Sequence, residues 1–189
     1  MRIIAGTARG QLIKAPPGRG TRPTTDRVRE AIFSALAPFL EGAYVLDAFA
    51  GSGALGLEAL SRGAAGVVFC EQARPAQLVI KENLAKLHWQ ERGRLLCGAA
   101  EQQLLHWPGE FNNSKEKKRP FDIVLLDAPY NQGLIAKIEP LLLREGFLAE
   151  GALVMLETSA REPELLADLR WQQLKNRVYG GTAVYYWEL

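Results

Sequence analysis

Apolar positions along the chain form two kinds of pattern. Short runs of mostly apolar residues are typical of buried strands, and they occupy residues 44–47, 66–71, 94–97, 121–127 and 151–157. Between these runs, apolar residues recur at helical spacing, which predicts helices over residues 25–40, 54–62, 75–89, 101–107, 132–143 and, shorter, 162–169. Strands that alternate with helices predict a doubly wound, mostly parallel α/β sheet.

Both ends of the chain have the pattern of a β-hairpin. Near the start, residues 2–5 and 11–15 flank a Gly-containing turn that carries Arg9 at its tip. Near the end, residues 171–179 and 182–188 flank Gly180 and Gly181, which adds antiparallel pairing to the sheet. A length of 189 residues suits one domain, 1–189, in which residues 1–23 form a small N-terminal extension.

Composition limits where the protein works. No apolar run approaches the roughly 20 residues that span a bilayer, and the N-terminal apolar stretch is too short for a signal peptide. We therefore expect a cytoplasmic protein, without membrane contact, that is a monomer. Cys70 and Cys97 lie in strand-like runs without a C-x-x-C spacing or a histidine partner. They are expected to be reduced core residues, and no metal site is predicted.

The basic residues are concentrated at the N-terminus. Residues 1–40 contain seven Lys or Arg and two acidic residues, a net charge of +5, while the whole chain carries only +2. Such an arm suggests a polyanionic partner, although a merely solvated arm would show the same pattern. The candidate nucleic-acid contacts are Arg9, Arg19, Arg22 and Arg27. A second basic run, Lys115, Lys117, Lys118 and Arg119, is interpreted as a solvated loop rather than a second contact.

The most informative stretch is residues 44–60, where a strand ends in Asp47 and passes through Gly51, Gly53 and Gly56 into a helix. G-x-G-x-x-G usually indicates a dinucleotide, but a carboxylate beside the turn would repel a pyrophosphate. Asp47 instead suits a ligand with positive charge, such as S-adenosylmethionine. The alternative is an ordinary strand, turn and helix without a ligand.

Other predicted strands also end in residues that are suited to binding such a ligand. Glu71 ends the next strand, where a carboxylate can accept hydrogen bonds from both ribose hydroxyls of an adenosine. Ala99 and Ala100 follow the third strand and would let the backbone lie against a planar base. Since ligands of open parallel sheets bind at the carboxyl ends of the strands, these residues are expected to converge with Asp47 and Asp127.

Asp127, Ala128, Pro129 and Tyr130 follow the fourth strand. An exocyclic base amine is a weak nucleophile, so an enzyme that methylates it must hold it and accept its N–H bonds. The Asp127 carboxylate and the Ala128 carbonyl are suitable acceptors, and Tyr130 can stack on the base. The structural alternative is a buried strand that ends in a proline turn, with Tyr130 in the core.

Together these pieces resemble the class I S-adenosylmethionine-dependent methyltransferases, and more narrowly the bacterial RsmD-type 16S ribosomal RNA guanine-N2 methyltransferases. The matching segments are residues 1–6 (MRIIAG), 22–30 (RPTTDRVRE), 47–56 (DAFAGSGALG) and the turn at Asp127. The resemblance implies a seven-stranded Rossmann-like sheet, no metal, and methylation of one guanine, usually numbered 966, in 16S ribosomal RNA or the small ribosomal subunit. In the family a proline stands where this chain has Ala128, which leaves the carbonyl but alters the stiffness of the turn.

By matching position, the resemblance implies a set of cofactor-binding residues, namely Thr24, Asp47, Phe49, Gly51, Gly53, Glu71, Ala99 and Ala100. It implies that Asp127, Ala128 and Tyr130 hold the guanine. Two alternatives stay open: methylation of another amine, such as adenine N6 or a glutamine amide, and an RNA-binding assembly module without catalysis. His88 and His106 do not end strands, and we expect them to be surface or packing residues.

Overall fold

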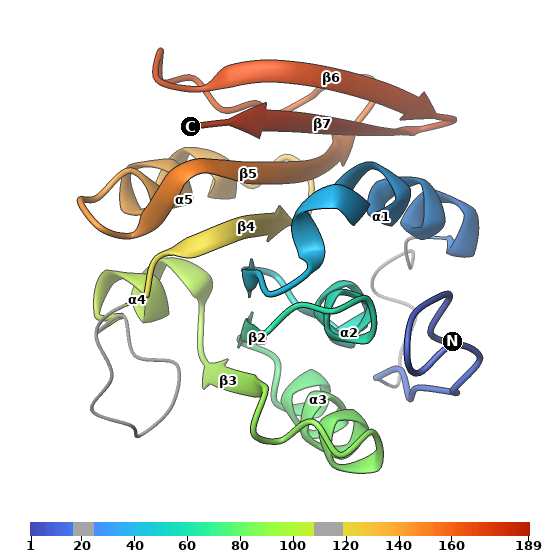
Figure 1. The fold of residues 1–189 in the computed structure, drawn as a ribbon. Helices are drawn as coiled ribbons and strands as arrows, with labels where there is room; N and C mark the ends of the chain where they lie inside the picture. The colour runs from blue at the N-terminus through green and yellow to red at the C-terminus, as the bar shows by residue number, and fades with distance from the viewer. Residues whose placement is uncertain (17–24, 108–118) are drawn as a thin grey trace.

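The computed structural model describes residues 1–16, 25–107 and 119–189. At its centre is a seven-stranded sheet with the order β3-β2-β1-β4-β5-β7-β6, which confirms the predicted doubly wound α/β architecture (Figure 1). Strands β1 to β5 are parallel, and β7 is antiparallel to both of its neighbours. The strands are Tyr44–Asp47 (β1), Gly66–Glu71 (β2), Gly93–Cys97 (β3), Phe121–Leu126 (β4), Leu148–Ser159 (β5), Gln172–Tyr179 (β6) and Thr182–Glu188 (β7).

In the described part of the chain, five helices cover the two faces of this sheet. They are Asp26–Leu40 (α1), Ala54–Ser61 (α2), Arg74–Lys86 (α3), Ala100–Leu105 (α4) and Leu134–Leu142 (α5). Successive strand residues point to opposite faces, so Val45 packs in one core with α1, α2 and α3, whereas Leu46 packs in a second core with α4 and α5. The near-continuous apolar strands of the sequence are explained by burial on both sides.

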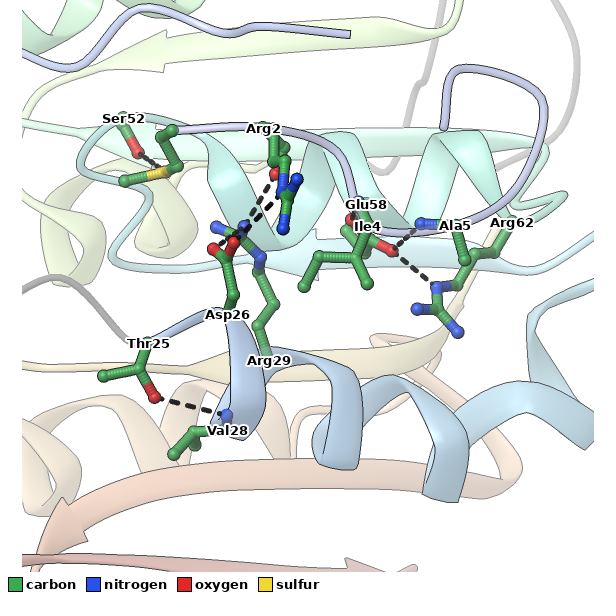
Figure 2. A network of polar contacts seen from close by, with 11 residues as sticks. Arg2, Ile4, Ala5, Thr25, Asp26, Val28, Arg29, Ser52, Glu58 and Arg62 are labelled. Atoms are coloured by element: carbon green, nitrogen blue, oxygen red, sulfur yellow. Dashed lines mark hydrogen bonds and ion pairs between the residues drawn. The ribbon is translucent and has the colours of Figure 1, made fainter. Parts of the chain in front are cut away.

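The N-terminal hairpin is shorter than predicted. Its regular pairing is reduced to one antiparallel bridge, between Arg2 and Leu12. Instead, the segment is fixed to α2 by the fully buried Glu58, whose carboxylate accepts hydrogen bonds from the backbone N–H groups of Ile4 (2.8 Å) and Ala5 (3.0 Å) and from Arg62 (2.7 Å) (Figure 2). The segment is therefore built into the fold rather than attached as a free arm.

Arg29 has a structural role at the start of α1. Its guanidinium is 1% exposed and donates to the Arg2 carbonyl (2.7 Å) and to Asp26 (2.9 Å), so it is not available to a partner (Figure 2). Burial lowers the pKa of Arg29, and the charge of Asp26 opposes that shift. Thr25 caps the helix by accepting from the N–H of Val28 at 3.3 Å.

Two sequence-based expectations are wrong. Residues 162–169 form no helix; their backbone N–H groups at Ala167 and Asp168 donate instead to the buried carboxylate of Glu139, at 2.7 and 2.9 Å. Cys70 is buried as expected, but Cys97 is exposed because β3 lies at the sheet edge and ends at the surface. Within the described residues, no helix has the length and apolar character needed to cross a membrane.

Candidate functional site

The site lies where neighbouring parallel strands end. Strand β1 is flanked by β2 and β4, and Asp47 pairs in register with Phe69 on one side and Leu125 on the other. Glu71 ends β2 and Asp127 directly follows β4, so three carboxylates from three adjacent strands meet at one edge of the sheet. This is the predicted convergence, and it places the acids where ligands of open α/β sheets bind.

The glycine turn after β1 brings its backbone close to this edge. Gly51 and Gly53 have φ values of 53° and 78°, in the left-handed region that favours glycine. Gly56 is required by close packing, because a Cβ there would lie 2.2 Å from the Phe69 ring. The turn is fastened to the neighbouring strand by the bond from Ala50 N–H to the Cys70 carbonyl, at 3.0 Å.

Asp47 is the most deeply buried acid of the site, at 1% exposure. Its Oδ2 accepts from the N–H of Gly56 at 2.9 Å, whereas its Oδ1 has no hydrogen-bond partner among the described residues. Burial raises the pKa of Asp47 to about 7; the Gly56 bond lowers it, and the charge of Glu71 raises it further. A buried oxygen without a partner is costly unless a ligand supplies a donor.

Glu71 is held in place by two backbone N–H groups. Its Oε2 accepts from the N–H of Gly51 at 2.8 Å and its Oε1 from the N–H of Ala73 at 2.7 Å. The side chain is only half-buried, and each carboxylate oxygen has a further lone pair. Glu71 can thus accept additional bonds from hydroxyl groups while it keeps the glycine turn in position.

The remaining predicted cofactor residues frame the same edge. Phe49 lies half-buried in the turn, and Ala99 is the N-cap of α4, with Ala100 buried behind it. The N–H of Gly98 donates to the Glu71 carbonyl at 2.9 Å and keeps the ends of β3 and β2 together. The side chains at positions 99 and 100 are both small, and that of Ala100 packs in the core with α4 and α5.

The segment after β4 forms the other side of the site. Asp127 is half-buried, Ala128 is buried, and Tyr130 is 39% exposed, so Tyr130 is not a core residue. The Tyr130 hydroxyl lies 3.4 Å from both Glu157 Oε1 and Thr182 Oγ1. Burial raises the pKa of Tyr130, the contact with Thr182 lowers it, and the nearby charges of Glu157 and Asp127 raise it again.

Sequence reasoning missed Glu157 and Thr182. Leu126 pairs with Leu156, so Glu157 lies beside Asp127 at the ends of β4 and β5, and it is 5% exposed. The signal was present, since the predicted fifth strand also ends in an acid. Thr182 could not be found in this way, because only the pairing of β7 with β5 brings it to the carboxyl edge.

The predicted RNA contacts are only partly described by the structure. Arg9 and Arg27 are exposed. Arg19, Arg22 and Thr24 lie outside the described residues, as do Lys115, Lys117 and Lys118. His88 and His106 are exposed, as expected for surface residues.

The described residues fit S-adenosylmethionine in their chemistry. The buried, unpartnered Oδ1 of Asp47 suits a cationic group, and Glu71 offers acceptors for a ribose. Gly51 and Gly53 place no side chain at the turn beside these two acids. In the described ranges we find no group of three or more His, Cys, Asp or Glu side chains arranged to hold a metal ion.

Comparison with known proteins agrees with this geometry. A family model described as "Conserved hypothetical protein 95" matches residues 1–188. The "Ribosomal RNA small subunit methyltransferase D" of Escherichia coli (strain K12) is 38% identical over 183 residues, covering 97% of this chain and 87% of that protein. The protein of the same name from Haemophilus influenzae is 34% identical over 181 residues, with 95% and 89% covered. A solved structure, "Putative methyltransferase yhhF from Escherichia coli", is 35% identical with a TM-score of 0.84, covering 100% of this chain and 97% of that one.

Proposed function

Because the chain belongs to the ribosomal RNA small subunit methyltransferase D family, we propose that it methylates the exocyclic N2 amine of one guanine in 16S ribosomal RNA, the base usually numbered 966, using S-adenosylmethionine. The observation that carries the proposal is the meeting of Asp47, Glu71 and Asp127 at adjacent strand ends. A ligand-binding half and a base-binding half thereby share one edge of a class I methyltransferase sheet.

The chain would hold S-adenosylmethionine through Asp47, Glu71 and the glycine turn. When bound, this cofactor supplies an electrophilic methyl group attached to a sulfonium. Once the methyl group is transferred, the sulfonium has become a neutral thioether, which is the leaving group. Asp47 contributes a negative charge that favours a cation, and its burial strengthens that attraction. Glu71 fixes the turn and accepts hydrogen bonds from hydroxyl groups. The small side chains of Ala99 and Ala100 leave room for a flat base.

The guanine would be held on the side of β4. Asp127 and the carbonyl of Ala128 accept the two N–H bonds of the amine, which orients the nitrogen lone pair toward the methyl group. As the nitrogen gains the methyl group it becomes more acidic, and the Asp127 carboxylate can take its proton and release it to solvent, since the side chain is half-buried. The exposed ring of Tyr130 offers a stacking surface, with its hydroxyl set against Glu157 and Thr182.

Ala128 departs from the proline of the family, but the backbone around it retains the feature that the chemistry needs. The following Pro129 disfavours helical geometry at residue 128, so an extended residue there leaves its carbonyl outside helical bonding. The alanine is buried, so the turn is also fixed by packing. We infer that the protein is active and acts as a monomer.

Nucleoside analysis tests this proposal. Purified protein is incubated with S-adenosylmethionine and 16S ribosomal RNA from a strain that lacks the enzyme, and the digested RNA is examined by mass spectrometry. N2-methylguanosine is expected, at a single position. N6-methyladenosine would instead identify an adenine methyltransferase, and RNA binding without any methylated product would support the assembly module.

A further inference from the structure

Asn83 joins three distant parts of the chain. This side chain of α3 is 0% exposed, and its Oδ1 accepts from the backbone N–H of Lys14 at 2.8 Å. Its Nδ2 donates to the carbonyl of Lys14 at 3.1 Å and to the carbonyl of Ser52 at 3.3 Å. Both amide protons and the carbonyl oxygen therefore have partners, which is the condition for burying an amide without a large cost.

The partners of Asn83 belong to the two working parts of the protein. Ser52 lies between Gly51 and Gly53 in the turn proposed to hold the cofactor. Lys14 lies at the end of the basic N-terminal segment, residues 1–14, which carries the exposed Arg9. The buried side chain of Asn83 is thus hydrogen-bonded to the backbone of both the glycine turn and the N-terminal segment.

A second set of contacts links the same two parts. Glu58 and Ser61 of α2 bind the backbone at Ile4, Ala5 and Ala8, and α2 begins directly at the glycine turn. Ser52 also donates through its hydroxyl to the sulfur of Met1, at 3.7 Å (Figure 2). The N-terminal segment is therefore attached at both of its ends to elements that border the turn.

We infer that Asn83 is a positioning residue that couples the cofactor turn to the N-terminal segment, so that cofactor and RNA bind cooperatively. The inference rests on the proposed function for the identity of the two ligands. A ligand bound against the Gly51–Ser52–Gly53 backbone restrains the Ser52 carbonyl further, which restrains the Asn83 amide and, through it, Lys14. The segment that meets RNA then fluctuates less, and less conformational entropy is lost when RNA binds.

Hydrogen exchange tests the inference in the unaltered protein. The probe is S-adenosylhomocysteine, which occupies the cofactor site without reacting. Exchange of the amides of Ile4, Ala5 and Lys14 is expected to slow at least about threefold when the probe binds, because these amides donate to Glu58 and Asn83. Binding of the probe without any slowing at these amides would overturn the inference.

Substitution separates coupling from simple stability. Asn83→Asp keeps an acceptor for Lys14 N–H but removes the donor to the carbonyls of both Ser52 and Lys14. The control, Glu82→Gln, alters the neighbouring residue of α3, which contacts the same Lys14 through an exposed ion pair at 2.7 Å. The affinity for a 16S ribosomal RNA transcript is measured with and without S-adenosylhomocysteine. By the reciprocity of coupled binding, the probe should tighten RNA binding about fivefold or more in the wild type and in Glu82→Gln.

In Asn83→Asp the ratio of the two RNA affinities should fall close to one, even if the protein is less stable, because the ratio compares two states of one variant. An unchanged ratio would show that coupling does not pass through Asn83. Failure of the protein to bind S-adenosylhomocysteine at all would contradict the proposed function. Loss of coupling in Glu82→Gln alone would place the link at the surface ion pair and overturn the assignment to Asn83.

Discussion

Asp47 Oδ2 accepts a hydrogen bond of 2.9 Å from the backbone N–H of Gly56, which ties the end of β1 to the first turn of α2. The bond uses one carboxylate oxygen for structure and leaves the other, Oδ1, buried beside the glycine turn. Asp47 therefore holds the turn through one carboxylate oxygen and places its other oxygen beside the turn, where it can meet a ligand. Several properties of the protein depend on these separate roles of the two carboxylate oxygens.

The first prediction concerns stability and pH at Asp47. Its pKa is about 7 in the folded protein and near 3.8 when unfolded, so the folded state binds one more proton between these values. Stability is therefore expected to fall as the pH rises from about 4 to about 7, by at most roughly 4 kcal/mol. Asp47→Asn keeps an oxygen for Gly56 and cannot titrate, so its stability should vary less. Urea denaturation at pH 5 and pH 8 measures both proteins; equal pH dependence would show that Asp47 is ionised throughout.

The second prediction concerns cofactor affinity. Glu71→Ala removes the acceptor for Gly51 N–H and for the ribose hydroxyls, which should weaken S-adenosylmethionine binding by about 1–3 kcal/mol. The control is Glu91→Ala, an exposed carboxylate that precedes β3 at the opposite edge of the sheet. Titration calorimetry should show a change only for Glu71. An unaltered affinity in Glu71→Ala would remove this residue from the site.

The third prediction concerns catalysis by Asp127. Asp127→Asn keeps the size of the side chain but removes the charge that accepts a proton, so turnover should fall about 10²–10⁴-fold. Asp122→Asn is a matched control, because Asp122 lies on β4, the strand that Asp127 directly follows, and serves structure by accepting from Tyr44 N–H at 2.7 Å. Its turnover should stay near wild type. If Asp127→Asn unfolds early but methylates normally, Asp127 is structural.

These tests address residues that the sequence already indicated, and the reason is physical. Asp47, Glu71 and Asp127 each follow a short apolar run, and parallel strands place their carboxyl ends at one edge, so a local pattern is enough to assemble them. Strands β1, β2 and β4 were predictable because burial on both faces produces continuous apolar runs, whereas the exposed β6 and its partner β7 were indicated by the Gly180–Gly181 turn.

The contacts missed by sequence reasoning join residues far apart in the chain. Glu58 fits the apolar face of its helix poorly, and its burial is explained by the nearby Arg62 together with the backbone of Ile4 and Ala5, which lies more than 50 residues away. Residues 162–169 have helical spacing, yet they adopt another conformation. In it the N–H groups of Ala167 and Asp168 donate hydrogen bonds to the Glu139 carboxylate. In both cases a buried carboxylate determines the local structure, and periodicity does not report such partners.

The fourth prediction uses two glycines of the N-terminal turn. Gly6 and Gly10 have nearly the same φ, 83° and 82°, so alanine at either position bears the same left-handed strain. A Cβ at Gly6 would lie 1.9 Å from the Ser61 carbonyl oxygen, whereas at Gly10 it would meet nothing within 4 Å. Gly6→Ala should therefore destabilise the protein by about 1–3 kcal/mol more than Gly10→Ala in urea denaturation. Equal losses would mean that the segment is not pressed against α2.

The fifth prediction concerns the contribution of Arg9 to RNA affinity. If this exposed arginine neutralises one phosphate, Arg9→Ala should weaken binding of 16S ribosomal RNA and lower the slope of log affinity against log salt by about 1. Lys137→Ala, an exposed cation on α5, should leave the slope unchanged. S-adenosylmethionine affinity, measured separately, should be unaffected. The same slope in wild type and Arg9→Ala would exclude a phosphate contact at this residue.

The attachment of the N-terminal segment also fixes an order of events during synthesis. Ile4 depends on Glu58, and Lys14 depends on Asn83, 54 and 69 residues later in the chain. Residues 1–14 are synthesised before α2 and α3, so they cannot take their final positions until these helices have emerged and packed on the sheet. A truncated chain that stops before residue 83 would leave its basic N-terminal segment without the bond to Asn83. The segment proposed to meet RNA is therefore completed only together with the turn proposed to hold the cofactor.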